Sequence, residues 1–205
     1  MKKIIITQRL SINKKTKEKR DSIDVKFIDL LLKVNLYPIP VPNLFHSLDY
    51  QTFNKFLKTI NPSGLILTGG ENYGINKPRD KLENRLLKYF TTNKKPILGI
   101  CRGAQMIAKF FGTNIVKVKN HVRVKHKTIL VTQDKFFPKF INSFHDYGIK
   151  KCPENFISTV LSEDKTVEAF KHKRFKWEGW MWHPERDKIF SNKSLKRIKK
   201  IFSQK

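Results

Sequence analysis

The sequence contains few cysteines, no long apolar run and few acidic residues. Its 205 residues include only two cysteines, Cys101 and Cys152, which excludes a disulfide framework and a four-cysteine zinc site. No apolar run approaches the roughly 18 residues that a membrane span needs, and the start of the chain turns polar too soon for a signal peptide. We therefore expect a cytoplasmic protein in which any role of cysteine is that of a single thiol.

Basic residues far outnumber acidic ones. There are 43 Lys and Arg against 17 Asp and Glu, which gives a formal net charge of +26. This balance is compatible with binding to nucleic acid, to an anionic membrane surface or to an acidic substrate. Lys, Asn, Ile and Phe are all plentiful, as in proteins from AT-rich genomes, and that bias explains the charge equally well. No recognised nucleic-acid module is present, so nucleic-acid binding is a distant alternative.

The apolar pattern predicts one α/β domain over residues 1–205. Hydrophobic residues make up 39% of the chain, which is enough for a substantial core in a domain of this size. Runs of apolar residues at 3–7, 64–68 and 96–100 are typical of buried parallel strands. Helical spacing between and after them predicts crossover helices, and strand alternating with helix indicates a parallel sheet.

Other segments of the chain have their own local signals. The helices are expected from Ser22, with Asp21 or Ser22 as N-cap, at 48–60, around Leu82 to Phe90, and at 193–202. Residues 13–20 are basic and poor in apolar side chains, which predicts a solvated loop. Prolines make residues 37–42 extended. Alternating apolar and polar residues at 115–131 and 156–170 indicate antiparallel strands.

Cys101 lies in a G-x-C-x-G pattern between a predicted strand and a predicted helix. Gly99 and Gly103 allow the sharp turn of a nucleophile elbow. The thiol is then expected at the N-terminus of a helix, where the helix dipole favours the nucleophilic thiolate. A buried structural cysteine in a strand-to-helix turn is the alternative interpretation.

A base and its orienting group follow in the sequence Trp182-His183-Pro184-Glu185. Pro184 ends the preceding aromatic strand, so His183 is expected at a strand end, where α/β folds build their sites. Glu185 is positioned to orient the imidazole. The segment Thr68-Gly69-Gly70-Glu71 ends another strand, and its backbone amides can join that of Arg102 in an oxyanion hole. A surface turn and an ordinary glycine turn are the alternatives.

Together these segments resemble the class I glutamine amidotransferase superfamily, and within it the gamma-glutamyl hydrolase branch of cysteine peptidases. Residues 67–71, 99–105 and 182–185 match in the family's order and spacing. The resemblance covers nearly the whole chain, to about residue 187. Further matches to gamma-glutamyl-GABA hydrolase-like proteins are Arg79-Asp80 with Glu83, Asn142-Ser143-Phe144-His145 and Val167-Glu168-Ala169.

The resemblance implies a flavodoxin-like, three-layer α/β fold with a parallel central sheet, helices on both faces and a smaller antiparallel portion in the C-terminal half. It implies that Cys101 forms a gamma-glutamyl thioester, that His183 with Glu185 behind it moves protons, and that the amides of Gly70 and Arg102 hold the oxyanion. The expected substrate-binding residues are Gly69, Glu71, Gln105, His121, Asn142, Ser143, Phe144 and His145. His46, His126 and His172 are expected to be solvated or structural, as is His121 in the alternative interpretation.

The leaving group is suggested by a basic segment at residues 117–127, which carries no acid and which in the family borders the substrate. Phosphates suit such a rim, because Lys and Arg pair with them by charge-assisted hydrogen bonds. Taken as a whole, the sequence resembles the small gamma-glutamyl-CDP-amidate hydrolases of bacterial capsule gene clusters, and the resemblance implies release of glutamate and cytidine diphosphoramidate for the phosphoramidate decoration of capsular polysaccharide. Additional phosphate candidates, in a loop expected to be mainly solvated, are Arg9, Lys14, Lys15 and Lys19.

Two related activities stay open: hydrolysis of gamma-glutamyl-GABA or gamma-glutamyl-polyamines, and a glutaminase subunit that delivers ammonia to a synthase. Nothing in the chain could serve as that synthase, so we expect no obligate synthase subunit. No metal or organic cofactor is expected, because the triad completes acyl transfer without one, and Glu71, Asp80 and the histidines lack metal-ligand spacing. Cys152, before Pro153, is expected to be an inert thiol.

Overall fold

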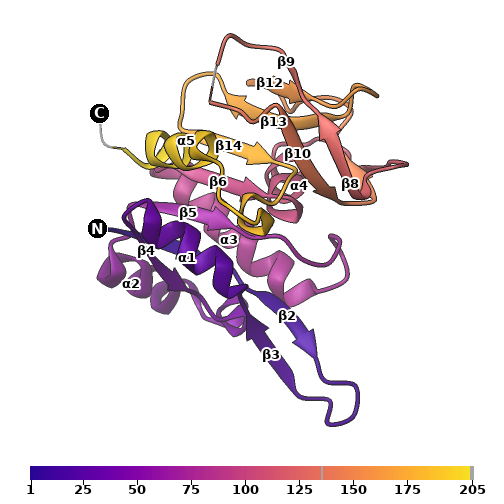
Figure 1. The fold of residues 1–205 in the computed structure, drawn as a ribbon. Coiled ribbons are helices and arrows are strands. Elements are labelled where there is room, and N and C mark those ends of the chain that lie inside the picture. Colours follow the sequence, from indigo (N-terminus) through magenta and orange to yellow (C-terminus); the bar gives the residue numbers. More distant parts are fainter. Residues whose placement is uncertain (135, 204–205) are drawn as a thin grey trace.

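The computed structural model describes residues 1–134 and 136–203 and is built around an eight-stranded sheet (Figure 1). The first five strands in the spatial order are mutually parallel, and each of the last three pairs antiparallel to the strand before it. The order is β4 (Leu36–Pro40), β1 (Lys2–Ile6), β5 (Gly64–Leu67), β6 (Ile97–Ile100), β14 (Trp177–Trp180), β13 (Val167–His172), β12 (Phe156–Leu161) and β9 (Ile129–Leu130).

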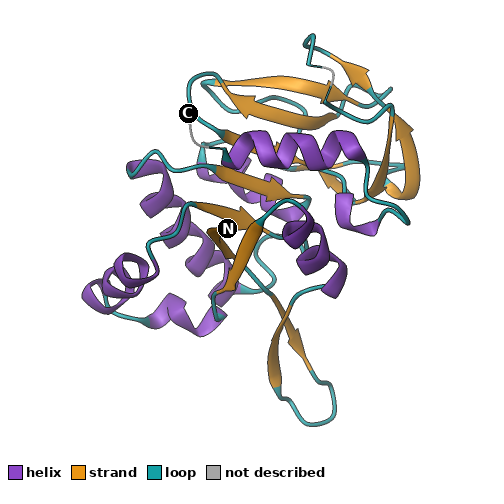
Figure 2. Ribbon diagram, turned by 60° about the vertical axis from the view of Figure 1, so that its left-hand side comes forward, coloured by secondary structure: helices purple, strands orange, loops and turns teal. Residues whose placement is uncertain are grey.

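Helices cover both faces of this sheet (Figure 2). On one face, α1 (Val25–Lys33) and α5 (Asn192–Phe202) bury apolar side chains in one core cluster. On the other face, α2 (Tyr50–Ile60), α3 (Lys77–Thr92) and α4 (Arg102–Phe110) build a second cluster. The central strands are fully buried between the two layers, which explains their continuous apolar sequences. The predicted three-layer α/β fold is confirmed.

Three small antiparallel pairs are attached to the sheet. Two of them lie in the C-terminal half: β8 (Val122–Lys127) with β10 (Phe140–Phe144), and β7 (Val116–Lys117) with β11 (Tyr147–Gly148). The alternating pattern predicted strands at 115–131 and 156–170, where β7, β8, β9, β12 and most of β13 lie, but it did not predict β10 and β11. The third pair, β2 (Arg9–Ile12) with β3 (Lys19–Ser22), is a hairpin that projects from the body of the molecule (Figures 1 and 2).

Two local predictions were wrong around this hairpin. Lys19 and Arg20, predicted to be in a loop, belong to β3, although the loop prediction holds for residues 13–18. Neither strand buries an apolar face, so the hairpin has no hydrophobic pattern. The N-cap of α1 is Asp24, whose Oδ1 accepts from Lys26 N at 2.9 Å. Asp21 instead accepts two hydrogen bonds from Asn43.

The C-terminal helix α5 is held to the sheet by a buried ion pair. Arg197 donates from Nε at 3.0 Å and from Nη2 at 2.5 Å to the carboxylate of Glu178 on β14. The helix was predicted to be basic and amphipathic, and Arg197 is the basic residue that it buries. In the part of the chain that the structure describes, no helix has the length and apolar content to cross a membrane.

Candidate active site

The carboxyl ends of β5, β6 and β14 bring the three predicted motifs together. Thr68 follows β5, Cys101 follows β6, and His183 follows β14 by three residues. These strands are neighbours in the parallel part of the sheet. The carboxyl edge of a parallel sheet is the usual place for a ligand site, because the chain leaves each strand there in a loop.

Cys101 lies in a strained turn between β6 and α4. Its backbone has φ 51° and ψ −108°, and it is the N-cap of the helix. Such a conformation is costly for a residue with a side chain and is found at functional sites. The turn also needs Gly103, because a Cβ there would lie 2.1 Å from the carbonyl oxygen of Leu67. The predicted elbow is therefore present, with the thiol at the N-terminus of α4.

His183 bridges the thiol and a carboxylate. Its Nδ1 lies 2.5 Å from Oε1 of Glu185, and the side chain of Cys101 lies near enough to the ring to raise its pKa. Burial by itself lowers the pKa of His183, but the hydrogen bonds and charges of Cys101 and Glu185 outweigh it and raise this pKa to about 9. At neutral pH the ring is thus an imidazolium, whose Nδ1 proton is accepted by Glu185.

Asn142 fixes the backbone at His183. Its Nδ2 donates to the carbonyl of His183 at 2.8 Å, and its Oδ1 accepts from the amide of the same residue at 2.9 Å. The ring of Phe144 packs edge-on against the imidazole at a centroid distance of 5.9 Å, and the guanidinium of Arg186 lies 4.5 Å over that phenyl ring. Asn142 and Phe144 were predicted to bind substrate, and the structure shows them contacting His183.

A cavity of about 340 Å³ opens beside the imidazole. This volume is within the range of ligand pockets. Gly69 lies so close to the ring that a Cβ would be 2.5 Å from Cε1 of His183, so only glycine fits there. The cavity is lined by Arg9, Ser22, Ile23, Asp24, Phe27, Thr68, Gly69, His183, Glu185 and Arg186.

A buried network of charges supports the elbow from behind. The Arg102 side chain pairs with Asp80 and Glu83, and Arg79 donates from Nε to Glu83 at 2.9 Å. Arg79 also donates to the carbonyl of Thr68 at 2.7 Å. Burial opposes the charge of Glu83, yet the two guanidinium groups lower its pKa. The sequence showed these residues only as family matches. The structure shows that they connect α3 to the loop after β5, through Thr68, and to the start of α4, through Arg102.

Of the eight predicted substrate-binding residues, Gly69 lines the cavity and the other seven are absent from its wall, four of them with buried side chains. Gln105 is buried and donates from Nε2 to the carbonyl of Tyr147 at 2.9 Å. Ser143 donates to the carbonyl of His121 at 2.6 Å. His121 and His145 are buried near one another, with ring centroids 4.9 Å apart. Their role in binding substrate stays a prediction.

Of the basic residues that the sequence singled out, Arg9 reaches the cavity, whereas the favoured rim at residues 117–127 does not. Arg9 and Arg186 line the cavity, whereas Lys119 and Lys125 of the predicted rim line a second cavity beside His121. Glu71 faces Arg9, with Oε1 3.8 Å from Nε. Arg186 was not predicted from the sequence, although its position directly after Glu185 was a signal for it.

The remaining histidines and the second thiol have structural partners. Nδ1 of His46 lies 2.9 Å from the carbonyl of Asn43 in the short 3-10 helix η1 (Asn43–Ser47). Nδ1 of His172 accepts from the amide of Arg174 at 3.0 Å. Burial raises the pKa of Cys152, which makes its thiol a poor nucleophile, as predicted.

Known proteins are similar to this chain in sequence and in fold. The family description "glutamine amidotransferase class-I" matches residues 20–196. A gamma-glutamyl-CDP-amidate hydrolase of Campylobacter jejuni is 35% identical over 97% of this chain and 96% of its own length, and a glutamine-hydrolysing GMP synthase subunit of Pyrococcus abyssi is 31% identical over 63% and 69%. A solved structure described as a GMP synthase subunit of Thermoplasma acidophilum superposes with a TM-score of 0.72 at 25% identity, covering 98% and 94%. The chain belongs to the class I glutamine amidotransferase family and is a hydrolase of amide carbon–nitrogen bonds.

Proposed function

We propose that the chain hydrolyses a gamma-glutamyl amide whose nitrogen carries a diphosphonucleoside, the best candidate being gamma-glutamyl-CDP-amidate. The observation that carries the proposal is that His183, which lies near Cys101 and contacts Glu185, lines a cavity with Glu185 and two arginines, Arg9 and Arg186. The similarity over nearly the full length of the Campylobacter jejuni hydrolase supports it. The products are glutamate and cytidine diphosphoramidate.

The catalytic residues act in two steps. Cys101 attacks the gamma-carbonyl as a thiolate, and the backbone amides of Gly70 and Arg102 stabilise the resulting oxyanion. His183 gives its proton to the leaving nitrogen, which departs and leaves a thioester on Cys101. The imidazole then takes a proton from water, the hydroxide attacks the thioester, and glutamate leaves as the thiolate is restored. Glu185 holds the ring in one orientation throughout and stabilises its positive form.

The two arginines suit a leaving group that carries phosphates. Guanidinium groups bind phosphate oxygens through paired, charge-assisted hydrogen bonds. Arg9 reaches the cavity from the projecting hairpin, and Arg186 reaches it from the turn that carries Glu185. A neutral amine as leaving group would give these two guanidinium groups no anionic partner on the substrate. The proposal therefore assigns the phosphates to the hairpin side of the cavity.

The wider setting of the proposal follows from the substrate. The enzyme acts as one domain without a synthase partner, in the cytoplasm, where nucleotide conjugates are made. Cytidine diphosphoramidate is then used for the phosphoramidate decoration of capsular polysaccharide.

The test compares glutamate release from four substrates: gamma-glutamyl-CDP-amidate, gamma-glutamyl-GABA, gamma-glutamylputrescine and glutamine. We expect kcat/KM to be highest for the nucleotide conjugate. A second measurement, trapping of the thioester by mass spectrometry, is expected to succeed with the wild-type enzyme and fail with Cys101→Ala. Absence of the thioester from the wild type contradicts the mechanism, whereas a preference for the unphosphorylated amides contradicts only the leaving group.

A glutaminase subunit is the second candidate, because glutamine-hydrolysing subunits of GMP synthases are among the relatives. It predicts that glutamine is the best of the four substrates and that a partner synthase stimulates its hydrolysis. Fast turnover of the nucleotide conjugate by the isolated chain contradicts this candidate.

A further inference from the structure

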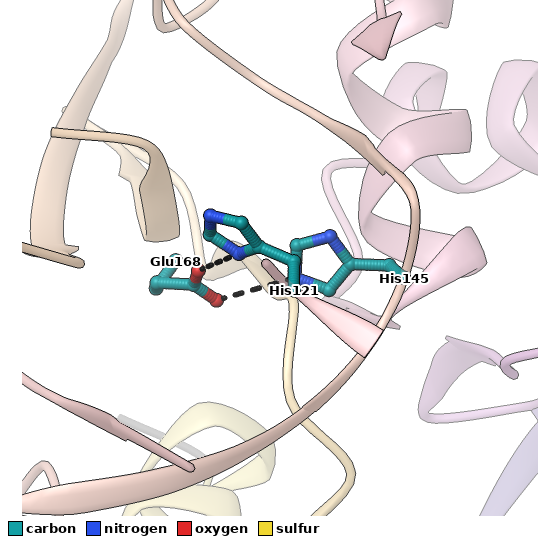
Figure 3. A group of neighbouring side chains, drawn as sticks. All are labelled: His121, His145 and Glu168. Atoms are coloured by element: carbon teal, nitrogen blue, oxygen red, sulfur yellow. Dashed lines mark ion pairs between the residues drawn. The ribbon is translucent and has the colours of Figure 1, made fainter. Parts of the chain in front are cut away.

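Three buried side chains that the proposed reaction does not use converge outside the catalytic cavity (Figure 3). His121 precedes β8, His145 follows β10, and Glu168 lies on β13. Their exposed fractions are 2%, 3% and 0%. Nδ1 of His121 lies 3.2 Å from Oε1 of Glu168, and Nε2 of His145 lies 3.6 Å from Oε2. Three elements that are distant in sequence thus present nitrogen and oxygen atoms to one point.

These atoms lack hydrogen-bond partners among the described residues. Nδ1 of His121, Nε2 of His145 and both oxygens of Glu168 are buried without one. Leaving a buried polar group unpaired destabilises the folded protein, so four such atoms in one place need an explanation. Neither His–Glu contact has the geometry of a hydrogen bond. Around a metal ion, the ligand atoms point their lone pairs at the ion and lie close together without hydrogen bonds between them, as these nitrogen and oxygen atoms do.

We propose that His121, His145 and Glu168 bind a divalent transition-metal ion, with Zn²⁺ as the best match. Zinc takes His nitrogen and carboxylate oxygen at about 2.0–2.2 Å in a tetrahedral arrangement, which places neighbouring ligand atoms about 3.3 Å apart. The separations of 3.2 and 3.6 Å, each to a different oxygen of Glu168, are close to this value, and one ligand atom from each residue lies within 4.8 Å of the others. Two imidazoles with one carboxylate are ligands that favour zinc over calcium or magnesium.

The outer nitrogens of both histidines are already held. Nδ1 of His145 lies 3.0 Å from the carbonyl of Tyr147, and Nε2 of His121 lies 3.3 Å from Oδ2 of Asp164. Each contact places the ring proton on the outer nitrogen and leaves the lone pair on the inner one. Carbonyl and carboxylate partners of this kind orient the histidine ligands of metal sites.

A route to solvent and a fourth ligand are available at the same place. A cavity of about 450 Å³ is lined by His121, His126 and Asp164, together with basic residues. The ring of His126 lies 4.2 Å from that of His121, centroid to centroid, and its Nε2 is also buried without a partner among the described residues. His126 or a water molecule can therefore complete the tetrahedron.

The position of the site assigns it a structural role. It joins the pair formed by β8 and β10 to β13 of the main sheet. Asn142, which holds the backbone of His183 through two hydrogen bonds, lies on the same strand β10. A bound ion would thus fix the segment that positions the catalytic imidazole, without touching the reaction itself.

The test uses untagged protein in the Cys101→Ala background, so that the reactive thiol does not bind metal. After chelator dialysis, we expect one equivalent of Zn²⁺ to bind and to raise the melting temperature. One equivalent of Co²⁺ is expected to give the ligand-field absorption of a tetrahedral N/O site. His145→Ala and Glu168→Gln are each expected to weaken Zn²⁺ binding by at least about 100-fold. His46→Ala is the control, because that histidine bonds to Asn43 elsewhere.

Two outcomes overturn the proposal. One is the absence of stoichiometric Zn²⁺ or Co²⁺ binding by the Cys101→Ala protein, a result that needs no further variant. The other is binding that His145→Ala and Glu168→Gln leave as tight as His46→Ala does. If either variant fails to fold, His121→Asn replaces it, judged by the same Co²⁺ spectrum.

Discussion

Nδ1 of His183 lies 2.5 Å from Oε1 of Glu185, and both side chains are buried. Only Pro184 separates the two residues, and it begins the short 3-10 helix η2 (Pro184–Arg186), which turns the carboxylate back toward the ring. Because the carboxylate accepts the Nδ1 proton, Nε2 faces the thiol side. The mechanism needs the thiol, the imidazole and the carboxylate in this order. Residues 183–185, which follow β14, and the turn at Cys101 after β6 therefore set it.

The pH dependence of the reaction should report the pKa of His183. With its pKa raised to about 9 by Cys101 and Glu185 against the lowering effect of burial, the ring keeps the proton for the leaving nitrogen up to that pH. We expect kcat/KM to fall on the alkaline side with an apparent pKa near 9. Glu185→Gln removes one of the raising contacts, so the alkaline limb should move to lower pH and kcat should fall by roughly 100-fold. Identical alkaline limbs in the two enzymes contradict this role of Glu185.

The close approach of α4 to β5 can be tested at Gly103. In Gly103→Ala the new Cβ would lie 2.1 Å from the carbonyl oxygen of Leu67, so the helix must move away from the strand. Overpacking of this kind costs about 1–3 kcal/mol, and the movement displaces Cys101 from His183. We expect a lower melting temperature and a lower kcat with a smaller change in KM. A variant with the stability and kcat of the wild type would show that the elbow tolerates a side chain.

The charges behind the elbow should matter for stability. Glu83→Gln keeps the volume but leaves the buried guanidinium groups of Arg79 and Arg102 with one acid fewer. Breaking a buried ion pair in this way costs about 3–5 kcal/mol, measured as the free energy of unfolding in urea. Glu154→Gln is the matched control, because Glu154 is exposed, and we expect it to change stability by less than about 0.5 kcal/mol. Equal effects of the two variants contradict the predicted contribution of the network.

The sequence predicts best those features whose signal is local. The elbow at Cys101 could be predicted because the strand, the glycines and the helix follow one another within a few residues. The pair of His183 and Glu185 could be predicted for the same reason, since they flank one proline. The parallel direction of the central strands was predictable from their continuous apolar sequences, because strands of this kind are covered by helices on both faces of the sheet.

Two kinds of feature could not be predicted from the sequence: exposed strands, which have no apolar pattern, and clusters of side chains from distant parts of the chain. The hairpin β2–β3 buries almost none of its side chains, so hydrophobic periodicity cannot show its strands. His121, His145 and Glu168 come together only when β13 lies beside the segments before β8 and after β10. Spacing along the chain therefore could not show their convergence. The phosphate rim was placed at residues 117–127 by charge density, whereas the cavity receives single arginines from β2 and η2.

Arg9 on the hairpin is expected to discriminate between leaving groups. Its side chain lines the catalytic cavity and is about half exposed, with Nε 3.8 Å from Oε1 of Glu71. If it binds a phosphate of the nucleotide, Arg9→Gln removes one charge-assisted hydrogen bond, which is worth about 1.5 kcal/mol in such a setting and corresponds to about a tenfold change. We expect kcat/KM for gamma-glutamyl-CDP-amidate to fall by about 10-fold, mainly through KM.

The hairpin also supplies the matched control for this prediction. Arg20 lies on the partner strand β3, pairs with Glu18 in solvent and is absent from the cavity wall, so Arg20→Gln changes the net charge by the same amount at a distance from the site. We expect it to leave kcat/KM nearly unchanged. With gamma-glutamylputrescine, whose leaving group carries no negative charge, Arg9→Gln should behave like the wild type. An equal loss of kcat/KM on both substrates would mean that Arg9 shapes the hairpin rather than contacting the leaving group. An equal loss in both variants would mean that the effect is long-range electrostatic attraction, which added salt should then abolish.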